Sequence, residues 1–170
     1  KALVGGEKVH IVAYNQTEVN RIVGLLGSAG VPLGQVGFVI AQTDDFWVRD
    51  NGPTFVFDAA GILRMTDWGF DGWGDDTPFA KDNVVPAAIA AAKSIPRIDV
   101  NEMVLEGGAI EVDGRGVLMA TRSSILEPNR NPGLTQQQAE VKMSTHLGVS
   151  KFIWLDGQDG GTEDIHDMPI

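Results

Sequence analysis

The chain contains no cysteine, which excludes a disulfide framework, a thiolate zinc site and a cysteine nucleophile within its 170 residues. It also lacks any run of about 18 apolar residues, so no segment is expected to span a membrane. No signal-peptide pattern opens the sequence, and we expect a cytoplasmic location. Basic residues are scarce: 13 Lys and Arg stand against 23 Asp and Glu, a formal net charge of -10. This charge disfavours nucleic acid as a partner and is compatible with a cationic substrate.

The residues that are present are typical of a globular α/β protein. With 43% hydrophobic residues, the chain can form a substantial core. Apolar strands are expected at 10–14, 36–40 and 151–155, helices at 17–26, 83–94 and 135–147, and hairpins at 54–65 and 109–121. Thr17 and Asn83 are the expected starts of the first two helices, and Gly148 is the expected end of the third.

The two hairpins belong to an internal repeat. With an offset of 55 residues, segments 55–63 and 110–118 share Asp, Gly and Leu at matching positions without a gap. The same offset places Ile98 on Ile153. A repeat of hairpin, helix and strand predicts a propeller or array, whose units need further copies to bury their faces. The first helix and strand are expected to be the tail of an earlier copy.

Two acidic turns carry the strongest functional signal. The first turn is Asp44-Asp45-Phe46-Trp47-Val48-Arg49-Asp50-Asn51-Gly52-Pro53. The second is Glu106-Gly107-Gly108, called the Glu106 turn below. Carboxylates beside an aromatic face suit a planar cation, because the acids accept paired N–H bonds while the ring covers the flat side. Since equivalent turns of a ring converge on one mouth, we expect both turns to face one guanidinium group.

Five segments in register carry a family resemblance: 45–54, 67–74, 105–110, 127–132 and 147–155. Their residues resemble the agmatine deiminase and bacterial (Porphyromonas-type) peptidylarginine deiminase family. The resemblance implies a pentein-type five-bladed α/β propeller of hairpin-helix-strand repeats. Residues 1–170 would then form an incomplete propeller domain, the first part of the ring with about three blades.

The resemblance also implies a reaction and roles for named residues. In this family a cysteine attacks the guanidinium carbon, a histidine moves protons, and two aspartates clamp the guanidinium nitrogens. By motif match, Asp50 is expected to be one clamp, Trp47 a pocket wall, and Glu106 the acid that orients the histidine. Asp45 and Trp73 lie in the same matching segments and are candidate substrate contacts. The implied reaction converts agmatine and water to N-carbamoylputrescine and ammonia without a cofactor.

The C-terminal segment departs from the family pattern. The family's histidine lies in an Asp-x-His-x-Asp setting before a glycine-rich cysteine segment, and this sequence ends before that segment. One register puts Pro169 where the histidine belongs, and it fits the neighbouring residues better. The other uses His166 itself, with Met168 at the second aspartate. His166 is kept as a candidate catalytic residue and Asp167 as a candidate substrate contact. This chain alone is expected to be inactive, with a complementary chain or the remainder of the propeller as its partner.

The segment 67–80 bears on the choice of substrate. It contains no Lys or Arg, whereas it contains Asp67, Asp71, Asp75 and Asp76. Such a segment repels a carboxylate and tolerates an ammonium tail, which favours agmatine over free or peptidyl arginine. The alternative is that this loop faces solvent and that Arg130 meets a substrate carboxylate.

Other interpretations stay open from the sequence. Arg49 and Asp50 can form a structural ion pair, Trp47 can belong to the core, and the glycines after Glu106 can serve a turn that needs positive φ. The parent protein can also be a peptidylarginine deiminase, or a non-catalytic binding or assembly module of the same fold. No cluster of residues has the spacing of metal ligands, so no metal site is expected.

Overall fold

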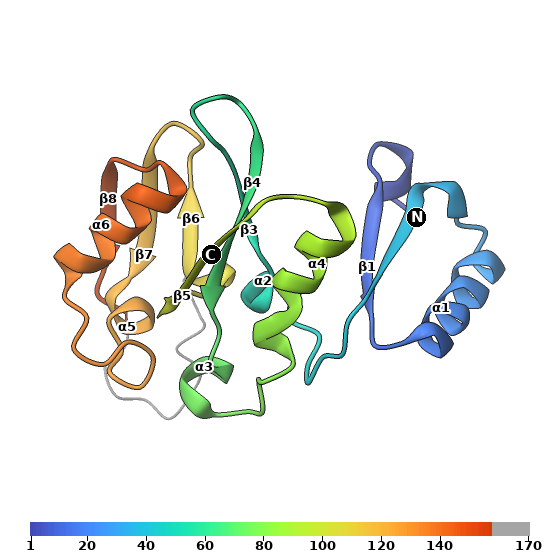
Figure 1. Cartoon of the computed structure of the whole chain (residues 1–170), viewed down its shortest axis with the longest axis horizontal. Helices are drawn as coiled ribbons and strands as arrows, with labels where there is room; N and C mark the ends of the chain where they lie inside the picture. Colours follow the sequence, from blue (N-terminus) through green and yellow to red (C-terminus); the bar gives the residue numbers. More distant parts are fainter. Residues whose placement is uncertain (158–170) are drawn as a thin grey trace.

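Three units lie side by side in the computed structural model, which describes residues 1–157 (Figure 1). The first unit is a strand-helix-strand element in which β1 (Val9–Ala13) and β2 (Val36–Ile40) pair in parallel and α1 (Gln16–Ser28) connects them. The other two units add a hairpin, so that each has a three-stranded sheet. The first unit corresponds to the predicted tail of an earlier copy. It contains a strand on each side of its helix, because β1 pairs with β2.

The second and third units share one order of elements. Each begins with a short turn, continues with an antiparallel hairpin, and returns through a helix to a strand that pairs in parallel. The second unit contains α2 (Val48–Asn51), β3 (Thr54–Phe57), β4 (Leu63–Gly69), α3 (Gly72–Asp75), α4 (Val85–Lys93) and β5 (Arg97–Val104). The third contains η4 (Gly107–Ala109), β6 (Ile110–Val112), β7 (Val117–Thr121), α5 (Arg122–Ile125), α6 (Gln136–Leu147) and β8 (Lys151–Leu155).

The repeat is confirmed in the hairpins, but its return strand is shifted by two residues. Phe57 pairs with Leu63 and Val112 with Leu118, which is the same register in both hairpins. In the return strands, Thr66 pairs with Ile98, whereas its equivalent Thr121 pairs with Leu155. Ile98 therefore corresponds to Leu155, and its predicted match with Ile153 was wrong. A slip of two residues keeps every side chain on the same face of the sheet, so the hydrophobic pattern does not reveal it.

The predicted helix α6 is confirmed at both ends. Thr135 and Gln138 form a reciprocal capping box at its start, and Gly148 ends it with a φ of 71°. Two predicted helix starts were wrong. Asn15, rather than Thr17, caps α1 by accepting a hydrogen bond from a backbone N–H. Asn83 lies in a 3-10 turn before α4, and its side chain accepts the backbone N–H of Phe70 instead.

The main core lies where the second and third units meet. Helix α6 buries Ala139 and Met143 against both sheets, and the cluster around them consists of Trp68, Val100, Met103, Leu105, Ile110, Leu118, Ala120, Ile125 and Val149. Helix α4 likewise contacts both β4 of its own unit and β2 of the preceding one. Both α4 and α6 thus pack between two sheets, as expected for repeated units that cannot bury their faces alone.

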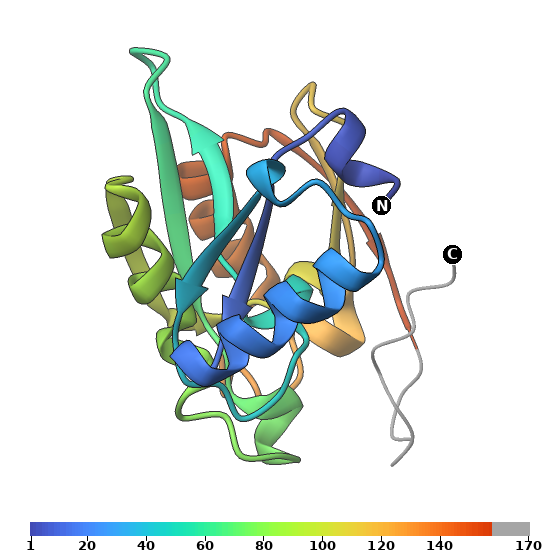
Figure 2. The same ribbon diagram turned by 90° about the vertical axis from the view of Figure 1, so that its right-hand side faces the viewer.

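This construction leaves two faces of the described chain without a neighbouring unit. Helix α1 lies at the outer end of the row (Figure 2), has no fully buried residue, and exposes 57% of Leu25. At the other end, Phe152 and Trp154 pack against the core, so Ile153 between them points to the opposite face of its sheet. Ile153 is 43% exposed there. Within residues 1–157, none of the helices combines the length and apolar character needed to cross a bilayer.

We predict that the 170-residue chain self-associates when it is produced alone. The reason is that its two unpartnered apolar faces are surfaces that associate in water. Light scattering during gel filtration over a range of concentrations measures this, and Leu25→Lys combined with Ile153→Lys should reduce the association. A sharply melting monomer at all concentrations would contradict the prediction.

Candidate active site

Asp50 lies on the single-turn helix α2, and its carboxylate is held by donors from two other elements. Its Oδ1 accepts the backbone N–H of Gly108 at 2.9 Å, although the two residues are 58 positions apart in sequence. Its Oδ2 accepts the indole N–H of Trp73 at 3.3 Å. The alternative that Arg49 and Asp50 form an ion pair was wrong, because Arg49 pairs with Glu111 at 3.4 Å. The two acidic turns therefore meet, as the repeat predicts.

The two glycines of the Glu106 turn are required by the close approach of α2, whose main chain meets Gly107 and whose Asp50 side chain meets Gly108. A Cβ atom on Gly108 would lie 2.4 Å from Asp50 Oδ1, and one on Gly107 would lie 2.1 Å from the carbonyl oxygen of Arg49. Neither glycine is among the residues with positive φ. The alternative that this turn needs a left-handed backbone was therefore wrong. Helix α2 and the turn pack so closely that only hydrogen fits between them.

Glu106 is buried and pairs with Arg130. The two side chains are 5% and 1% exposed, and Glu106 Oε1 accepts from Arg130 Nε at 2.6 Å. Burial raises the pKa of the Glu106 carboxyl, and the charge of Arg130 opposes that shift. The resemblance predicts a histidine partner for Glu106, but its candidate His166 and the candidate Asp167 lie outside the described residues. Arg130 was missed as a partner; its place in a matching segment was the only signal for it.

The loop that contains Asp71 and Trp73 contributes to the same region. Trp73 and Gly74 have left-handed φ angles of 63° and 92°, and the Asp71 side chain accepts the N–H of Gly74 at 2.9 Å. The indole of Trp73 meets the ring of Phe70 edge to face, with 5.1 Å between their centroids. Burial raises the pKa of Asp71, and Arg130 opposes this shift as well. This local geometry places the Trp73 N–H at the carboxylate of Asp50.

Asp45 and Trp47 lie in the loop before α2, which a buried carboxylate anchors. Asp82 is fully buried and accepts the backbone N–H of Asp44 at 2.9 Å and that of Asp45 at 3.0 Å. The Asp45 carboxylate itself accepts the N–H of Phe46 at 2.7 Å. Trp47 is 49% exposed and its ring lies 4.6 Å from that of Phe46. The alternative that Trp47 is a core residue was therefore wrong.

The acids of segment 67–80 do not act as one charged surface. Asp67 is 1% exposed and forms an ion pair with Arg97 of β5, so its charge is compensated inside the sheet. Asp71 is half-buried, whereas Asp75 and Asp76 are exposed. Arg130, the alternative partner for a substrate carboxylate, is buried against Glu106. Among residues 1–157, no three His, Asp or Glu side chains are grouped so that they could hold a metal ion.

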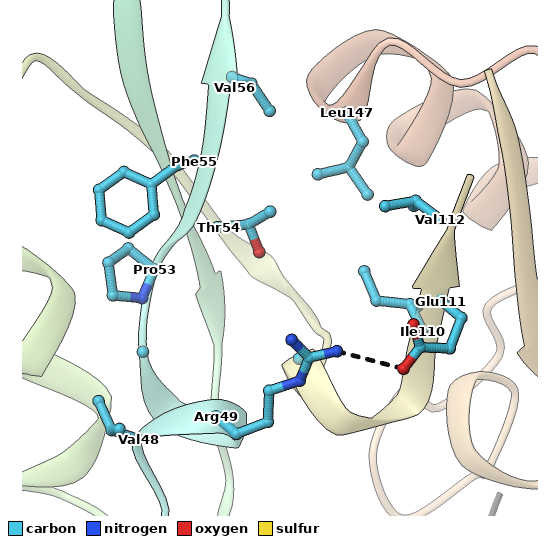
Figure 3. A pocket seen from close by; sticks show the side chains of 12 residues that line it. Val48, Arg49, Pro53, Thr54, Phe55, Val56, Ile110, Glu111, Val112 and Leu147 are labelled. Carbon is cyan, nitrogen blue, oxygen red and sulfur yellow. Dashed lines mark hydrogen bonds and ion pairs between the residues drawn. The ribbon is translucent and has the colours of Figure 1, made fainter. Parts of the chain in front are cut away.

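A groove with a volume of about 540 Å³ separates β3 from β6 (Figure 3). Arg49 and Glu111 face each other across it, and Ile110, Val112 and Leu147 line its apolar wall. Gly107 lines the groove, but the predicted site residues of the described chain do not. The groove therefore borders the Glu106 turn without including the candidate carboxylates Asp45, Asp50 and Glu106.

We predict that Gly108→Ala lowers the free energy of unfolding of the full-length protein by about 1–3 kcal/mol, a typical cost of overpacking. The new methyl group must displace the Asp50 carboxylate. Urea unfolding measures the change. Gly34→Ala is the matched control, because a Cβ there meets nothing within 4 Å. Its effect should stay within about 0.5 kcal/mol. Equal stability of the two variants would show that the turn has room to relax.

Deiminases are among the known proteins that this chain resembles. A family model described as Porphyromonas-type peptidyl-arginine deiminase matches residues 1–167. An agmatine deiminase of Pseudomonas aeruginosa is 41% identical over 127 residues, which are 72% of this chain and 34% of that protein. An agmatine deiminase of Pseudomonas syringae pv. tomato is 39% identical over 144 residues, which are 81% of this chain and 39% of that protein.

Solved structures agree with these matches. An agmatine deiminase of Enterococcus faecalis has 30% identity and a TM-score of 0.78, over 91% of this chain and 42% of that chain. A C. jejuni agmatine deiminase with substrate bound has 27% identity and a TM-score of 0.77, over 92% and 44%. The predicted pentein-type α/β propeller, present here in part, is thereby confirmed. The chain spans well under half the length of these relatives. Because the family model covers nearly the whole sequence, the chain belongs to the Porphyromonas-type peptidyl-arginine deiminase family.

Proposed function

We propose that this chain is the guanidinium-binding portion of an agmatine deiminase, which converts agmatine and water to N-carbamoylputrescine and ammonia. The observation that carries the proposal is the Asp50 carboxylate, which Gly108 and Trp73 hold beside the turn of the buried Glu106. The names of the similar proteins support the substrate. Since the chain spans only 34% and 39% of two of these relatives, the activity belongs to a longer protein.

The described residues are suited to binding and orienting a planar cation. An ionised carboxylate has about four acceptor positions, and Asp50 uses one on each oxygen for Gly108 and Trp73. The remaining positions can accept two parallel N–H groups of a guanidinium group. Such a clamp fixes the guanidinium carbon for attack by a nucleophile from outside this chain. Trp73 beside the clamp and Trp47 on the exposed loop are the proposed walls for the flat faces, and Asp45 is a proposed second acid.

Glu106 takes a different role in this proposal. Its burial and its ion pair keep it from acting as a freely accessible clamp. A buried carboxylate can instead hold a neighbouring histidine in its charged form while protons move to the departing ammonia. We keep His166 as the candidate for that histidine and Asp167 as a candidate substrate contact. Residues 1–170 are proposed as an incomplete propeller domain in a cytoplasmic protein, without a nucleic-acid partner and without a cofactor.

Peptidyl-arginine deimination is the second candidate, because the matching family is described by that activity. Such an enzyme must accommodate a peptide at the far end of the side chain, and one that acts on free arginine must neutralise a carboxylate. In the described chain, Arg130 is committed to Glu106 and Arg97 to Asp67. The exposed Asp75 and Asp76 disfavour a carboxylate. Because Arg130 and Arg97 are already paired and the exposed acids repel a carboxylate, agmatine is favoured over arginine as the substrate.

We predict that the full-length protein releases ammonia and a ureido product, with kcat/KM for agmatine above that for arginine or a peptide ending in arginine. The reason is that acidic loops tolerate the ammonium tail of agmatine and repel a carboxylate. A colorimetric ureido assay gives the three values. Arginine at or above agmatine would contradict the choice of substrate, and three blank reactions would contradict the deiminase assignment or support a non-catalytic module.

Asp50→Asn should lower kcat/KM of the full-length protein at least about 100-fold with the fold intact. Loss of one partner of a buried charge pair costs about 2–5 kcal/mol. Steady-state kinetics and circular dichroism measure both parts of this expectation. Asp113→Asn is the matched control, because the Asp113 carboxylate also accepts two N–H groups, both from the backbone, but lies in the hairpin between β6 and β7. Wild-type activity of Asp50→Asn would remove Asp50 from the site.

A further inference from the structure

The turn at 127–131 holds the backbone that leads into Glu106. Asn131 is 7% exposed, and its side chain both accepts from the N–H of Val104 and donates to the carbonyl of Val104, each at 2.9 Å. The same side chain donates to the carbonyl of Ile125 at 2.9 Å. Asn131 thus replaces a neighbouring strand at the end of β5. This fixes the main chain two residues before Glu106.

The preceding residue of the same turn holds the Glu106 side chain. Arg130 Nε donates to Glu106 Oε1 at 2.6 Å, and both side chains are almost completely buried. Asn131 therefore fixes the backbone before Glu106, and its neighbour Arg130 fixes the Glu106 carboxylate. The sequence pattern of this turn, with two Asn and a Pro, indicates only a turn. The structure shows that it is the support of the Glu106 turn.

The cost of this arrangement is visible in the guanidinium group of Arg130. Its Nη1 and Nη2 atoms are buried without a hydrogen-bond partner among the described residues. A Cβ on Gly74 would lie 3.8 Å from Nη1, so the loop after Trp73 covers the group closely. A buried charge with so few bonds is a weak source of stability, and apolar residues of similar volume often serve as well. Stability alone therefore does not explain an arginine at this position.

We propose that Arg130 is a positioning residue of the deiminase reaction, which holds the Glu106 carboxylate in one orientation and in its ionised form. This inference rests on the proposed function, in which Glu106 supports a positively charged histidine. Arg130 itself touches neither substrate nor reacting atoms in this assignment. It acts through Glu106, and Asn131 sets the backbone on which Glu106 lies.

The electrostatics around Glu106 support this role. The charged groups that act on it come from two elements: Arg130 from the turn at 127–131, and Asp71 from the loop after β4. Burial and Asp71 raise the pKa of Glu106, whereas Arg130 lowers it. Removal of Arg130 leaves burial and Asp71, which favour the protonated acid, opposed only by a backbone hydrogen bond to the Glu106 carboxylate. The ionised form is then lost at a higher pH than in the wild type.

The test uses the full-length protein with Arg130→Met and Arg130→Lys. Glutamate labelled with ¹³C at the carboxyl reports the ionisation of Glu106, with its signal assigned by Glu106→Gln. In Arg130→Met, we expect the titration midpoint of Glu106 to move up by about 1–3 pH units. The acidic limb of the kcat/KM profile should move with it. At neutral pH, kcat should fall up to about 100-fold with little change in KM, because the misplaced group is not a substrate contact.

Arg130→Lys keeps the charge but loses the planar fork. Its Glu106 titration midpoint should therefore lie close to that of the wild type, whereas its kcat should recover only in part. Arg97→Met is the matched control, since it also removes a guanidinium group from a buried acid, Asp67, but lies in the sheet of the second unit. It should lower stability and leave the Glu106 titration and the acidic limb at their wild-type positions.

The outcomes separate this inference from the proposed function. An unmoved Glu106 titration in both Arg130 variants would overturn the inference, whatever the activity. A moved titration with an unmoved acidic limb and unchanged kcat would also overturn it, because Glu106 would then be coupled to Arg130 without serving catalysis. A wild-type protein that is inactive on every guanidine would overturn the proposed function. If Arg130→Met does not fold, Arg130→Lys still tests the inference through the rate: kcat at neutral pH should fall with little change in KM, and an unchanged kcat would overturn the inference.

Discussion

The contact between α2 and the Glu106 turn is the constraint on which the candidate site depends. The two segments approach so closely that Gly107 and Gly108 have room for hydrogen only, and this brings the N–H of Gly108 to the carboxylate of Asp50. The two segments belong to different units, and α6 packs between the sheets of those units. The site is therefore assembled by the packing of whole units. The Asp50 carboxylate, which is the proposed clamp, is thus held in one orientation by the protein itself, and such preorganisation is the condition for effective electrostatic catalysis.

The charge balance of the buried groups fits a cationic ligand. Glu106 and Asp71 both act on Arg130, and burial raises the pKa of each acid. One described cation thus lowers the pKa of one buried and one half-buried acid. A guanidinium group bound beside them would favour their ionised forms and lower both pKa values. By linkage, cation binding strengthens as the pH rises through the raised pKa values and weakens as the pH falls below them.

Sequence reasoning found the elements of this fold well because each sheet has one buried face. The strands at 36–40 and 151–155 and both hairpins follow from local patterns. The two-residue slip at Ile98 was not visible, since it conserves the pattern of faces. Asn83 was misread because its side chain satisfies a backbone group 13 residues away rather than its own helix. The meeting of Asp50 with the Glu106 turn followed from the repeat, but the ion pair of Arg130 depends on tertiary packing that no local pattern encodes.

The position of Asp50 depends on contacts between α2 and the third unit, which meet beside the groove between β3 and β6. Gly107 lines this groove, and the backbone N–H of the next residue, Gly108, donates to the Asp50 carboxylate. The Arg49–Glu111 ion pair crosses the groove and joins α2 to β6 (Figure 3). It is mostly exposed, so its own contribution to stability is small. The four residues of α2 are too few to form a stable helix alone, and the second and third units together hold the carboxylate in place.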